Sequence, residues 1–303
     1  MVFKIIILGS NSAIPTIKRF PTAQLLNHND RFFLIDCAEG TQLQLRRYRI
    51  RMQRINHILI SHLHGDHFFG LIGLISSMHL LGRTKELYVY GPSPLMEILD
   101  IQLDASQTEL NYPLSFHELH PEQSEQIYED DMLIITTIPL NHRIPTCGFL
   151  FREKQRKRKL KKRITKSLNI PVDEFVKIKE GADFIDASGR VYKNDEITEE
   201  AAISRAYAYC SDTGYYEPII PFIKDVDLLY HEATFMNDKA DVAAKKFHST
   251  TVEAATIAKK ANVKKLIIGH YSNRYDNLDD LLSETKEVFP NTGIAIDGKS
   301  FDV

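Results

Sequence analysis

Cysteine and long apolar runs are both scarce in this chain of 303 residues. Cys37, Cys147 and Cys210 are too few and too widely spaced for a disulfide framework, and they fit a reducing cytoplasm. They also lack zinc-finger spacing, so any bound metal is expected on His and Asp side chains. The apolar opening, MVFKIIILGS, is too short to cross a membrane and has no signal-peptide cleavage pattern. We therefore expect a cytoplasmic protein without a membrane partner, whose first residues form a strand.

The net charge of −2 alone indicates no polyanionic partner, but the charge is unevenly distributed. The segment KQRKRKLKKR, residues 154–163, has eight basic residues and no acidic one, and the rest of the chain has 30 basic against 40 acidic residues. A charge run of this kind is usually a solvated, mobile loop. The alternative is a surface that holds a nucleic-acid backbone through its phosphates. The basic residues are Lys154, Arg156, Lys157, Arg158, Lys159, Lys161, Lys162 and Arg163.

The order of the apolar segments predicts an α/β fold with many strands and with helices mostly later in the chain. A hairpin is expected around residues 27–30. A helix is expected over 250–261, because Thr250 and Glu253 form a capping-box pattern. Residues 152–199 interrupt this alternation, since they are charged and poor in large apolar residues. We interpret residues 1–303 as a single domain into which 152–199 is inserted as an arm.

Three histidines and an aspartate lie within seven residues in SHLHGDH, residues 61–67. Imidazole and carboxylate together suit zinc and neighbouring metals in the periodic table. His62 and His64 are two residues apart, so in an extended segment they project to the same side. Asp66 and His67 follow where the chain is expected to turn into a helix. This spacing predicts a metal site.

Four apolar strands each lead into a residue that can bind a metal, namely His62, His142, Asp212 and His270. In α/β proteins the carboxyl ends of strands are where sites form. We predict that His62, His64 and His142 hold one metal, and that Asp66, His67 and His270 hold a second. Asp212 is expected to bridge the two, because a carboxylate can ligate both. Two metals roughly 4 Å apart are suited to in-line displacement at phosphorus.

Each of the later residues also has a simpler interpretation. His142 and His270 could be hydrogen-bonded residues at strand ends, and Asp212 could begin a turn with Thr213 and Gly214. His248 could only lead into the helix at Thr250.

Several stretches resemble the ribonuclease Z family of the metallo-β-lactamase superfamily, in the right order over nearly the whole chain. SHLHGDH resembles the superfamily motif His-x-His-x-Asp-His. HEAT at 231–234 and HST at 248–250 resemble two late motifs of the family, and SDTG at 211–214 resembles the stretch with the bridging aspartate. The resemblance implies an αββα sandwich, two zinc ions and a homodimer. It also implies that the arm at 152–199 is an exosite, a separate region that grips tRNA. Manganese or iron could replace zinc on His and Asp ligands.

The resemblance further implies a reaction, the removal of the 3′ trailer from precursor tRNA. This hydrolysis leaves a 3′-hydroxyl on the tRNA and a 5′-phosphate on the trailer. Asp66 would accept the proton of the attacking water. His248 would protonate the leaving oxygen, and Glu232 would orient His248 and favour its protonated form.

Two other functions are compatible with parts of the pattern. A hydrolase of the same superfamily that acts on a small ester or phosphodiester would need no basic arm. A non-catalytic, metal-stabilised RNA-binding protein would bind tRNA without cutting it and would tolerate the loss of Asp66.

Overall fold

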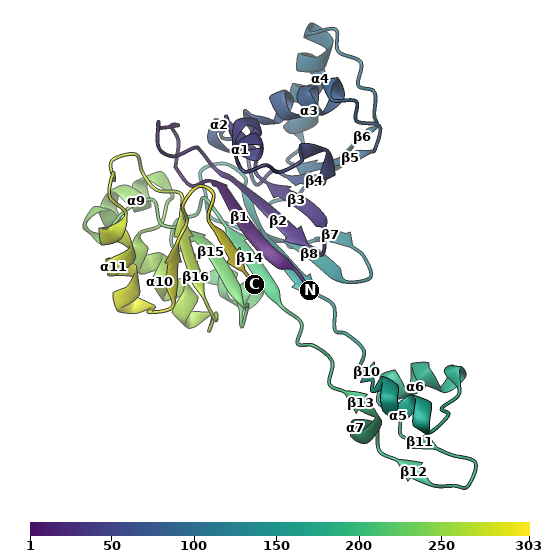
Figure 1. Cartoon of the computed structure of the whole chain (residues 1–303). Coiled ribbons are helices and arrows are strands. Elements are labelled where there is room, and N and C mark those ends of the chain that lie inside the picture. Colours follow the sequence, from purple (N-terminus) through teal and green to yellow (C-terminus); the bar gives the residue numbers. More distant parts are fainter. The chain divides into compact units, whose positions relative to one another are not determined.

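The computed structural model describes residues 1–303, which form two compact units (Figure 1). The larger unit comprises residues 1–127, 135–151 and 206–303, and the smaller comprises 128–134 and 152–205. No helix is both long enough and apolar enough to cross a membrane.

The first sheet has seven strands in the order β18-β1-β2-β3-β4-β5-β6. Strands β3 to β6 run parallel, whereas β1, β2, β3 and β18 pair antiparallel. The strands are β1 (Phe3–Gly9), β2 (Ala23–His28), β3 (Arg31–Ile35), β4 (Ile55–Leu59), β5 (Leu87–Gly91), β6 (Leu114–Glu118) and β18 (Ser300–Asp302).

The second sheet also has seven strands, in the order β17-β16-β15-β14-β9-β8-β7. Strands β14 to β17 run parallel, so their carboxyl ends share one edge of the sheet. The strands are β7 (Gln126–Glu129), β8 (Leu133–Pro139), β9 (Cys147–Glu153), β14 (Ala206–Cys210), β15 (Leu228–Glu232), β16 (Leu266–Gly269) and β17 (Thr292–Ile294).

Helices cover the outer face of each sheet, which gives the αββα sandwich that the family resemblance implies. Leucines of α1, α3 and α4 pack on the first sheet, and alanines and leucines of α10 and α11 pack on the second. The helices of the larger unit are α1 (Thr41–Arg47), η1 (Met52–Arg54), α2 (Gly65–Phe68), α3 (Leu71–Leu80), α4 (Pro94–Ala105), η3 (Glu217–Ile219), α8 (Ile220–Ile223), η4 (Asn237–Lys239), α9 (Ala240–Lys246), α10 (Thr251–Lys260) and α11 (Asp279–Val288).

Aromatic side chains fill the space between the two sheets. Phe33 of β3 meets Phe151 of β9 edge to face, with ring centroids 5.9 Å apart. The hydroxyl of the fully buried Tyr207 donates to Gln24 Oε1 at 2.5 Å, and thus links β14 to β2. Such contacts fix the two sheets against each other, and with them the strand ends from which the site is built.

The smaller unit has its own elements and its own core. Its apolar core consists of Ile170, Ile178, Phe184 and Ile197. The elements are β10 (Lys159–Leu160), α5 (Lys162–Ser167), η2 (Val172–Glu174), α6 (Phe175–Lys179), β11 (Phe184–Ile185), β12 (Val191–Tyr192), α7 (Asn194–Ile197) and β13 (Thr198–Glu199). We refer to residues 152–205 as the arm. It is a small folded unit, because the three isoleucines and Phe184 bury one another.

Local predictions for the larger unit are largely confirmed. The hairpin turns at Asn29 and Asp30, both in the left-handed region with φ of 48° and 69°. Helix α10 begins with the expected capping box, in which Glu253 N donates to Thr250 Oγ1 at 3.2 Å and Thr250 N donates to Glu253 Oε2 at 2.8 Å. The sequence analysis missed β7, β18 and α9, which are short elements stabilised by their neighbours.

Candidate metal centre

The histidine loop connects the carboxyl end of β4 in the first sheet to α2. His64 precedes the helix in an extended conformation (φ −74°, ψ 142°), and α2 begins at Gly65. Asp66 and His67 therefore occupy the first turn, as the spacing predicts. The loop presents His62 and His64 from extended backbone and Asp66 and His67 from helical backbone, so the four side chains divide between two neighbouring positions.

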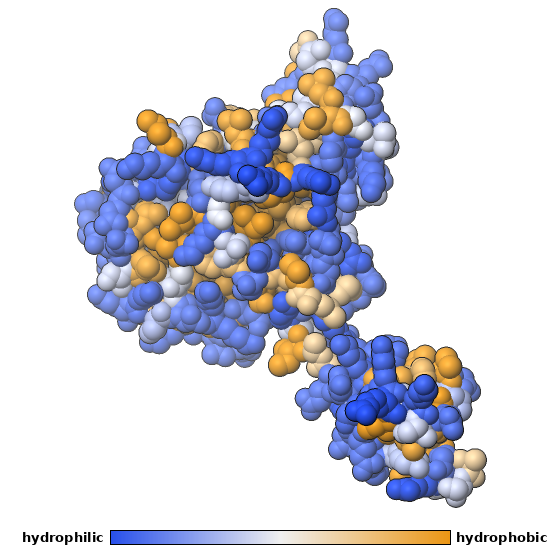
Figure 2. Space-filling model, in the orientation of Figure 1, coloured by the Kyte–Doolittle hydropathy of each residue, from blue (hydrophilic) through white to orange (hydrophobic).

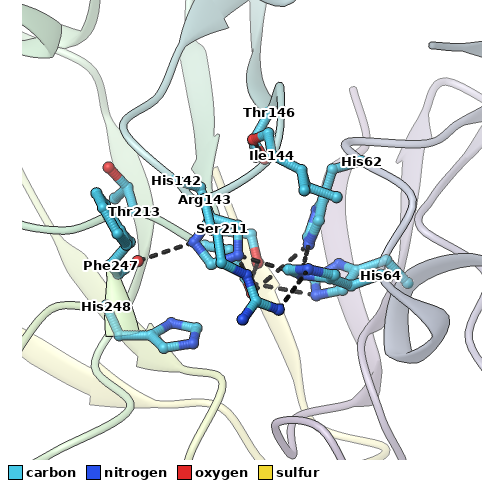
Figure 3. A network of polar contacts seen from close by, with 12 residues as sticks. His62, His64, His142, Arg143, Ile144, Thr146, Ser211, Thr213, Phe247 and His248 are labelled. Carbon is cyan, nitrogen blue, oxygen red and sulfur yellow. Dashed lines mark hydrogen bonds and ion pairs between the residues drawn. The ribbon is translucent and has the colours of Figure 1, made fainter. Parts of the chain in front are cut away.

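Three imidazole nitrogens meet at the first position. His64 Nδ1 lies 3.1 Å from His62 Nε2 and 3.1 Å from His142 Nε2 (Figure 3). His142 reaches this position from the loop after β8. Of the three, His64 alone faces this position with Nδ1, whereas His62 and His142 face it with Nε2.

Asp212 lies between the first position and the second. Its Oδ2 is 3.6 Å from His62 Nε2 and 3.7 Å from His142 Nε2. Its Oδ1 is 3.2 Å from His67 Nε2 and 3.1 Å from His270 Nε2. One carboxylate thus faces both groups of histidines, with one oxygen toward each. This is the arrangement that a bridging ligand needs.

Asp66 completes the second position. Its Oδ2 lies 3.7 Å from His67 Nε2 and 3.5 Å from His270 Nε2. All seven predicted ligands therefore come together in the predicted groups, within which the ligand atoms lie no more than 4.8 Å apart. A third group, Asp212, His248 and His270, meets the same limit and places His248 at the edge of the centre.

The donor set fits divalent metal ions. The Nε2 atoms of His67 and His270 are fully buried and have no hydrogen-bond partner. A buried nitrogen without a partner is costly unless a further group satisfies it. A metal ion among the imidazoles and carboxylates would supply that partner for both.

Each imidazole that offers Nε2 is oriented through its Nδ1. Ser61 Oγ lies 3.0 Å from Nδ1 of His62, and Thr234 Oγ1 lies 3.0 Å from Nδ1 of His270. The main-chain oxygen of Phe247, shown in Figure 3, lies 2.9 Å from Nδ1 of His142. An Nδ1–H bond of this kind fixes the tautomer that leaves Nε2 free to bind a metal.

Asp36 orients the remaining histidine and was missed by the sequence analysis. It is fully buried at the end of β3 and has a φ of 55°. Its Oδ2 lies 2.8 Å from His67 Nδ1, and it also accepts from the Tyr209 hydroxyl at 2.6 Å and from the Ser61 backbone N–H at 2.8 Å. The signal in the sequence was that Asp36, like the four strand-end residues, directly follows an apolar strand.

The environment makes several ligands available to a metal at neutral pH. Burial, together with neighbouring histidines, holds the pKa of His62 well below its usual value, and burial lowers the pKa of His64 and His142. Their lone pairs are therefore free. Burial also disfavours a charge on His67, but three carboxylates, that of Asp212 foremost, raise its pKa well above the usual value. Metal binding must displace that proton, so acid competes with the metal.

Glu232, which is buried, and His248, which is partly buried, form an acid–imidazole pair beside this centre. His248 Nδ1 lies 2.7 Å from Glu232 Oε1, and Glu232 also accepts from Thr213 N at 2.9 Å. Burial opposes a charged His248, but the Glu232 carboxylate outweighs it and raises the pKa of His248 to about 9. Burial alone would raise the pKa of Glu232, but the neighbouring His248 outweighs burial, and the pKa of Glu232 is lowered from its usual value. His248 is therefore positively charged at neutral pH and able to donate a proton.

A cavity of about 480 Å³ opens onto these groups. It is lined by Asp66, Asp212, His248 and His270, together with side chains of the loops around them. The arm, with its eight basic residues, belongs to the other compact unit.

Comparison with known proteins identifies the family. A curated ribonuclease Z of Bacteroides thetaiotaomicron is 47% identical over 97% of this chain and 93% of its own length. That of Cytophaga hutchinsonii is 47% identical over 100% of this chain and 97% of its own. The chain belongs to the ribonuclease Z family. Over residues 3–164 it also matches the family model described as Anti-Pycsar protein Apyc1, which places this part of the chain in that family as well.

Solved structures agree on the fold. The short form of human tRNase Z superimposes with a TM-score of 0.72 at 26% identity, over 98% of both chains. YhfI of Bacillus subtilis, a metallo-β-lactamase fold protein, superimposes with a TM-score of 0.69 at 20% identity, over 100% of both chains. A ribonuclease Z with this histidine and aspartate cluster is a metal-dependent hydrolase of the metallo-β-lactamase fold.

Proposed function

We propose that this protein is the zinc-dependent endonuclease that removes the 3′ trailer from precursor tRNA. The observation that carries the proposal is the cluster of seven buried or partly buried candidate ligands in a chain 44–47% identical to curated ribonucleases Z over nearly its whole length. A hydrolase of small esters would need the same cluster but no basic arm, so the arm favours the larger, polyanionic substrate.

Two zinc ions would be held in two places that share Asp212. His62, His64 and His142 would hold the first, and Asp66, His67 and His270 the second. Bound there, the ions would supply Lewis-acid chemistry, activating a water for attack and neutralising charge on the phosphate. Manganese or iron would fit the same ligands, because neither His nor Asp selects zinc alone.

The remaining steps belong to protein side chains. Asp66 faces the cavity and would accept a proton from the attacking water. Water attacks phosphorus and the bond to the 3′-oxygen breaks, so that the phosphate stays on the 5′ end of the trailer. His248, kept charged by Glu232, would donate its proton to the departing 3′-oxygen.

The arm would hold the tRNA backbone through its basic side chains. Several basic side chains of the run 154–163 already have partners within the smaller unit. Arg156 pairs with Glu153 at 2.6 Å, and Lys157 pairs with Glu180 at 2.7 Å. Lys159, Lys162 and Arg163 are exposed, line a cavity of about 1140 Å³, and have no carboxylate within 4.0 Å. These three are the basic residues best placed for phosphate contacts.

We also propose a cytoplasmic homodimer, in keeping with the family resemblance. Large apolar side chains reach the surface around α3 and α4, where Figure 2 shows orange atoms. Leu80 is 81% exposed and Ile101 is 60% exposed. Sedimentation equilibrium should give twice the chain mass of 34.8 kDa, and a monomer at micromolar concentration would contradict the proposal.

The decisive experiment is single-turnover cleavage of a precursor tRNA, with and without a chelator, with the product ends mapped. We expect one cut, a tRNA 3′-hydroxyl, a trailer 5′-phosphate and loss of activity with the chelator. Uncut precursor tRNA combined with hydrolysis of a small phosphodiester would instead favour the small-substrate hydrolase.

A further inference from the structure

Two side chains that line the cavity beside the metal centre have no part in the mechanism described above. Arg143 lies in the loop between β8 and β9, directly after the predicted ligand His142. Phe69 follows α2, directly after the histidine loop. Both border the cavity of about 480 Å³ together with His64 and Asp66.

Arg143 offers a positive charge that no protein carboxylate neutralises. Its side chain is exposed, and no Asp or Glu oxygen lies within 4.0 Å of its guanidinium. Its Nη2 lies 3.5 Å from His64 Nε2, and Figure 3 shows the guanidinium beside that ring. The Arg143 guanidinium therefore contacts the side of the His64 ring that faces away from the first metal position.

The tautomer of His64 determines whether its Nε2 is a hydrogen-bond donor toward Arg143. His64 turns Nδ1 toward His62 and His142, so in the metal-binding tautomer the proton is on Nε2. The Nε2–H of His64 and the Nη2–H of Arg143 then both lack an acceptor in the protein. Two donors 3.5 Å apart, one on a guanidinium, suit an anionic oxygen placed between them.

Phe69 exposes an aromatic ring to solvent at the border of the cavity. It is 65% exposed, although Phe68 beside it is buried. Its ring lies close to Gly65, where a Cβ atom would come within 2.1 Å of a ring carbon. Glycine at position 65 thus lets the ring approach the histidine loop closely, at the border of the cavity.

We propose that Arg143 and Phe69 form a nucleotide clamp at the cut site. Arg143, together with His64 Nε2–H, binds a non-bridging oxygen of the scissile phosphate, and Phe69 stacks on an unpaired base of a nucleotide adjoining that phosphate. This clamp rests on the proposed function, since its ligand is single-stranded RNA. Stacking of a base on an aromatic ring tolerates any sequence, so the clamp would position the strand without selecting among tRNAs.

The test uses precursor tRNA in which a methylene group replaces the 3′-bridging oxygen, so that the metal-loaded enzyme binds but cannot cut. We expect Arg143→Ala and Phe69→Ala each to weaken the affinity about tenfold, with metal content unchanged by elemental analysis. Phe69→Trp should retain the affinity and Phe69→Leu should lose it. Arg51→Ala and Ile296→Ala, exposed positions outside the cavity, are matched controls that should change affinity less than about twofold.

Abasic substitutions identify the stacking partner. An abasic nucleotide on one side of the linkage should weaken wild-type binding and have no further effect on Phe69→Ala. Additive losses at both flanking positions, unchanged affinity in both alanine variants, or loss of metal in either would overturn the clamp. Cleavage of ordinary precursor tRNA by the wild-type protein is measured first. If it fails, the proposed function is wrong, whereas intact cleavage with unaffected variants refutes the clamp alone.

Discussion

At the scale of single residues, His248 is the side chain whose chemistry depends most on one neighbour. The Glu232 carboxylate at 2.7 Å keeps it charged at neutral pH, against the effect of burial. Proton donation needs the charged form, so activity should fall as the pH rises through the pKa of His248. Bound metal ions would offset the contribution of Asp66 and Asp212, which places this break at or below about 9.

We predict that His248→Ala slows single-turnover cleavage by roughly 10²- to 10⁴-fold and removes the alkaline break, while tRNA affinity changes little. Glu232→Gln should move the break to lower pH. The measurement is the pH–rate profile of the chemical step. An unchanged profile shape in both variants would mean that His248 only leads into α10.

Asp36 shows how a residue outside the ligand set can determine metal affinity. It accepts from Nδ1 of His67 and lies in a fully buried network with Tyr209 and Ser61. Asp36→Asn keeps the shape but removes the negative charge and one of the two acceptor oxygens, so the contact that orients His67 is weakened. We expect roughly 10- to 100-fold weaker metal binding at the second position.

Titration with a metal-ion buffer would measure this change, and the stoichiometry should fall from two ions toward one at limiting metal. Tyr209→Phe is the matched control, because it removes another hydrogen bond of Asp36 and leaves the contact with His67 intact. Equal effects of the two substitutions would assign Asp36 to the stability of the core instead.

At the scale of elements, some basic side chains of the arm are paired with its own carboxylates, and others remain available to bind a partner. Deleting 154–163 would remove β10 and the start of α5, and so would unfold the arm. Replacing Lys159, Lys162 and Arg163 with Ala keeps the apolar core. We predict weaker tRNA affinity and a salt slope smaller by roughly two to three, because about one counterion is released per phosphate contact.

Binding measured across a series of salt concentrations would test this prediction. The control replaces Lys157 and Lys177, which pair with Glu180 and Glu174 on the same unit. If the triple variant keeps the wild-type slope, the arm does not contact the RNA backbone. If the control variant lowered the salt slope of tRNA binding equally, the effect would be one of net charge, and Lys159, Lys162 and Arg163 would not form a specific binding surface.

At the scale of the whole molecule, the metal centre joins the two halves of the sandwich. Its candidate ligands follow strands of both sheets, and the buried Nε2 atoms of His67 and His270 make no hydrogen bond within the protein. Each ion present at 100 times its dissociation constant would stabilise the fold by about 2.7 kcal/mol. We therefore predict that chelation lowers Tm by several degrees, roughly 2–4 °C for each kcal/mol.

Differential scanning calorimetry should show this decrease, and the decrease should be smaller at pH 6 than at pH 8. The sign follows from His67, whose proton competes with the metal because its pKa is raised well above the usual value. His64→Ala should reduce the effect of the chelator and abolish cleavage, while leaving the tRNA binding contributed by the arm in place. A chelator-independent Tm in the wild-type protein would contradict a metal-stabilised sandwich.

Much of the candidate site could be predicted, because its residues follow local rules. The histidine loop has a fixed spacing, and His142, Asp212 and His270 each follow an apolar strand. Asp36 also follows a strand, but a lone acidic residue there has many ordinary explanations. The orienting roles of Thr234 and of the Phe247 main chain depend on distant partners, and no local pattern reports them. The close approach of the Phe69 ring to Gly65 likewise depends on packing and could not be predicted from the sequence pattern.

The sequence by itself determined which residues end strands, where the histidine loop turns into a helix, and that residues 152–199 differ in composition from the rest. Those features depend on neighbours in the chain. Only the tertiary structure decided which oxygen of Asp212 faces which histidines, that Asp36 orients His67, and that only part of the basic run is free of partners. The relations at the candidate site join segments distant in the chain and exist only once the two sheets have packed together, whereas the pairing within the basic run exists once the arm has folded.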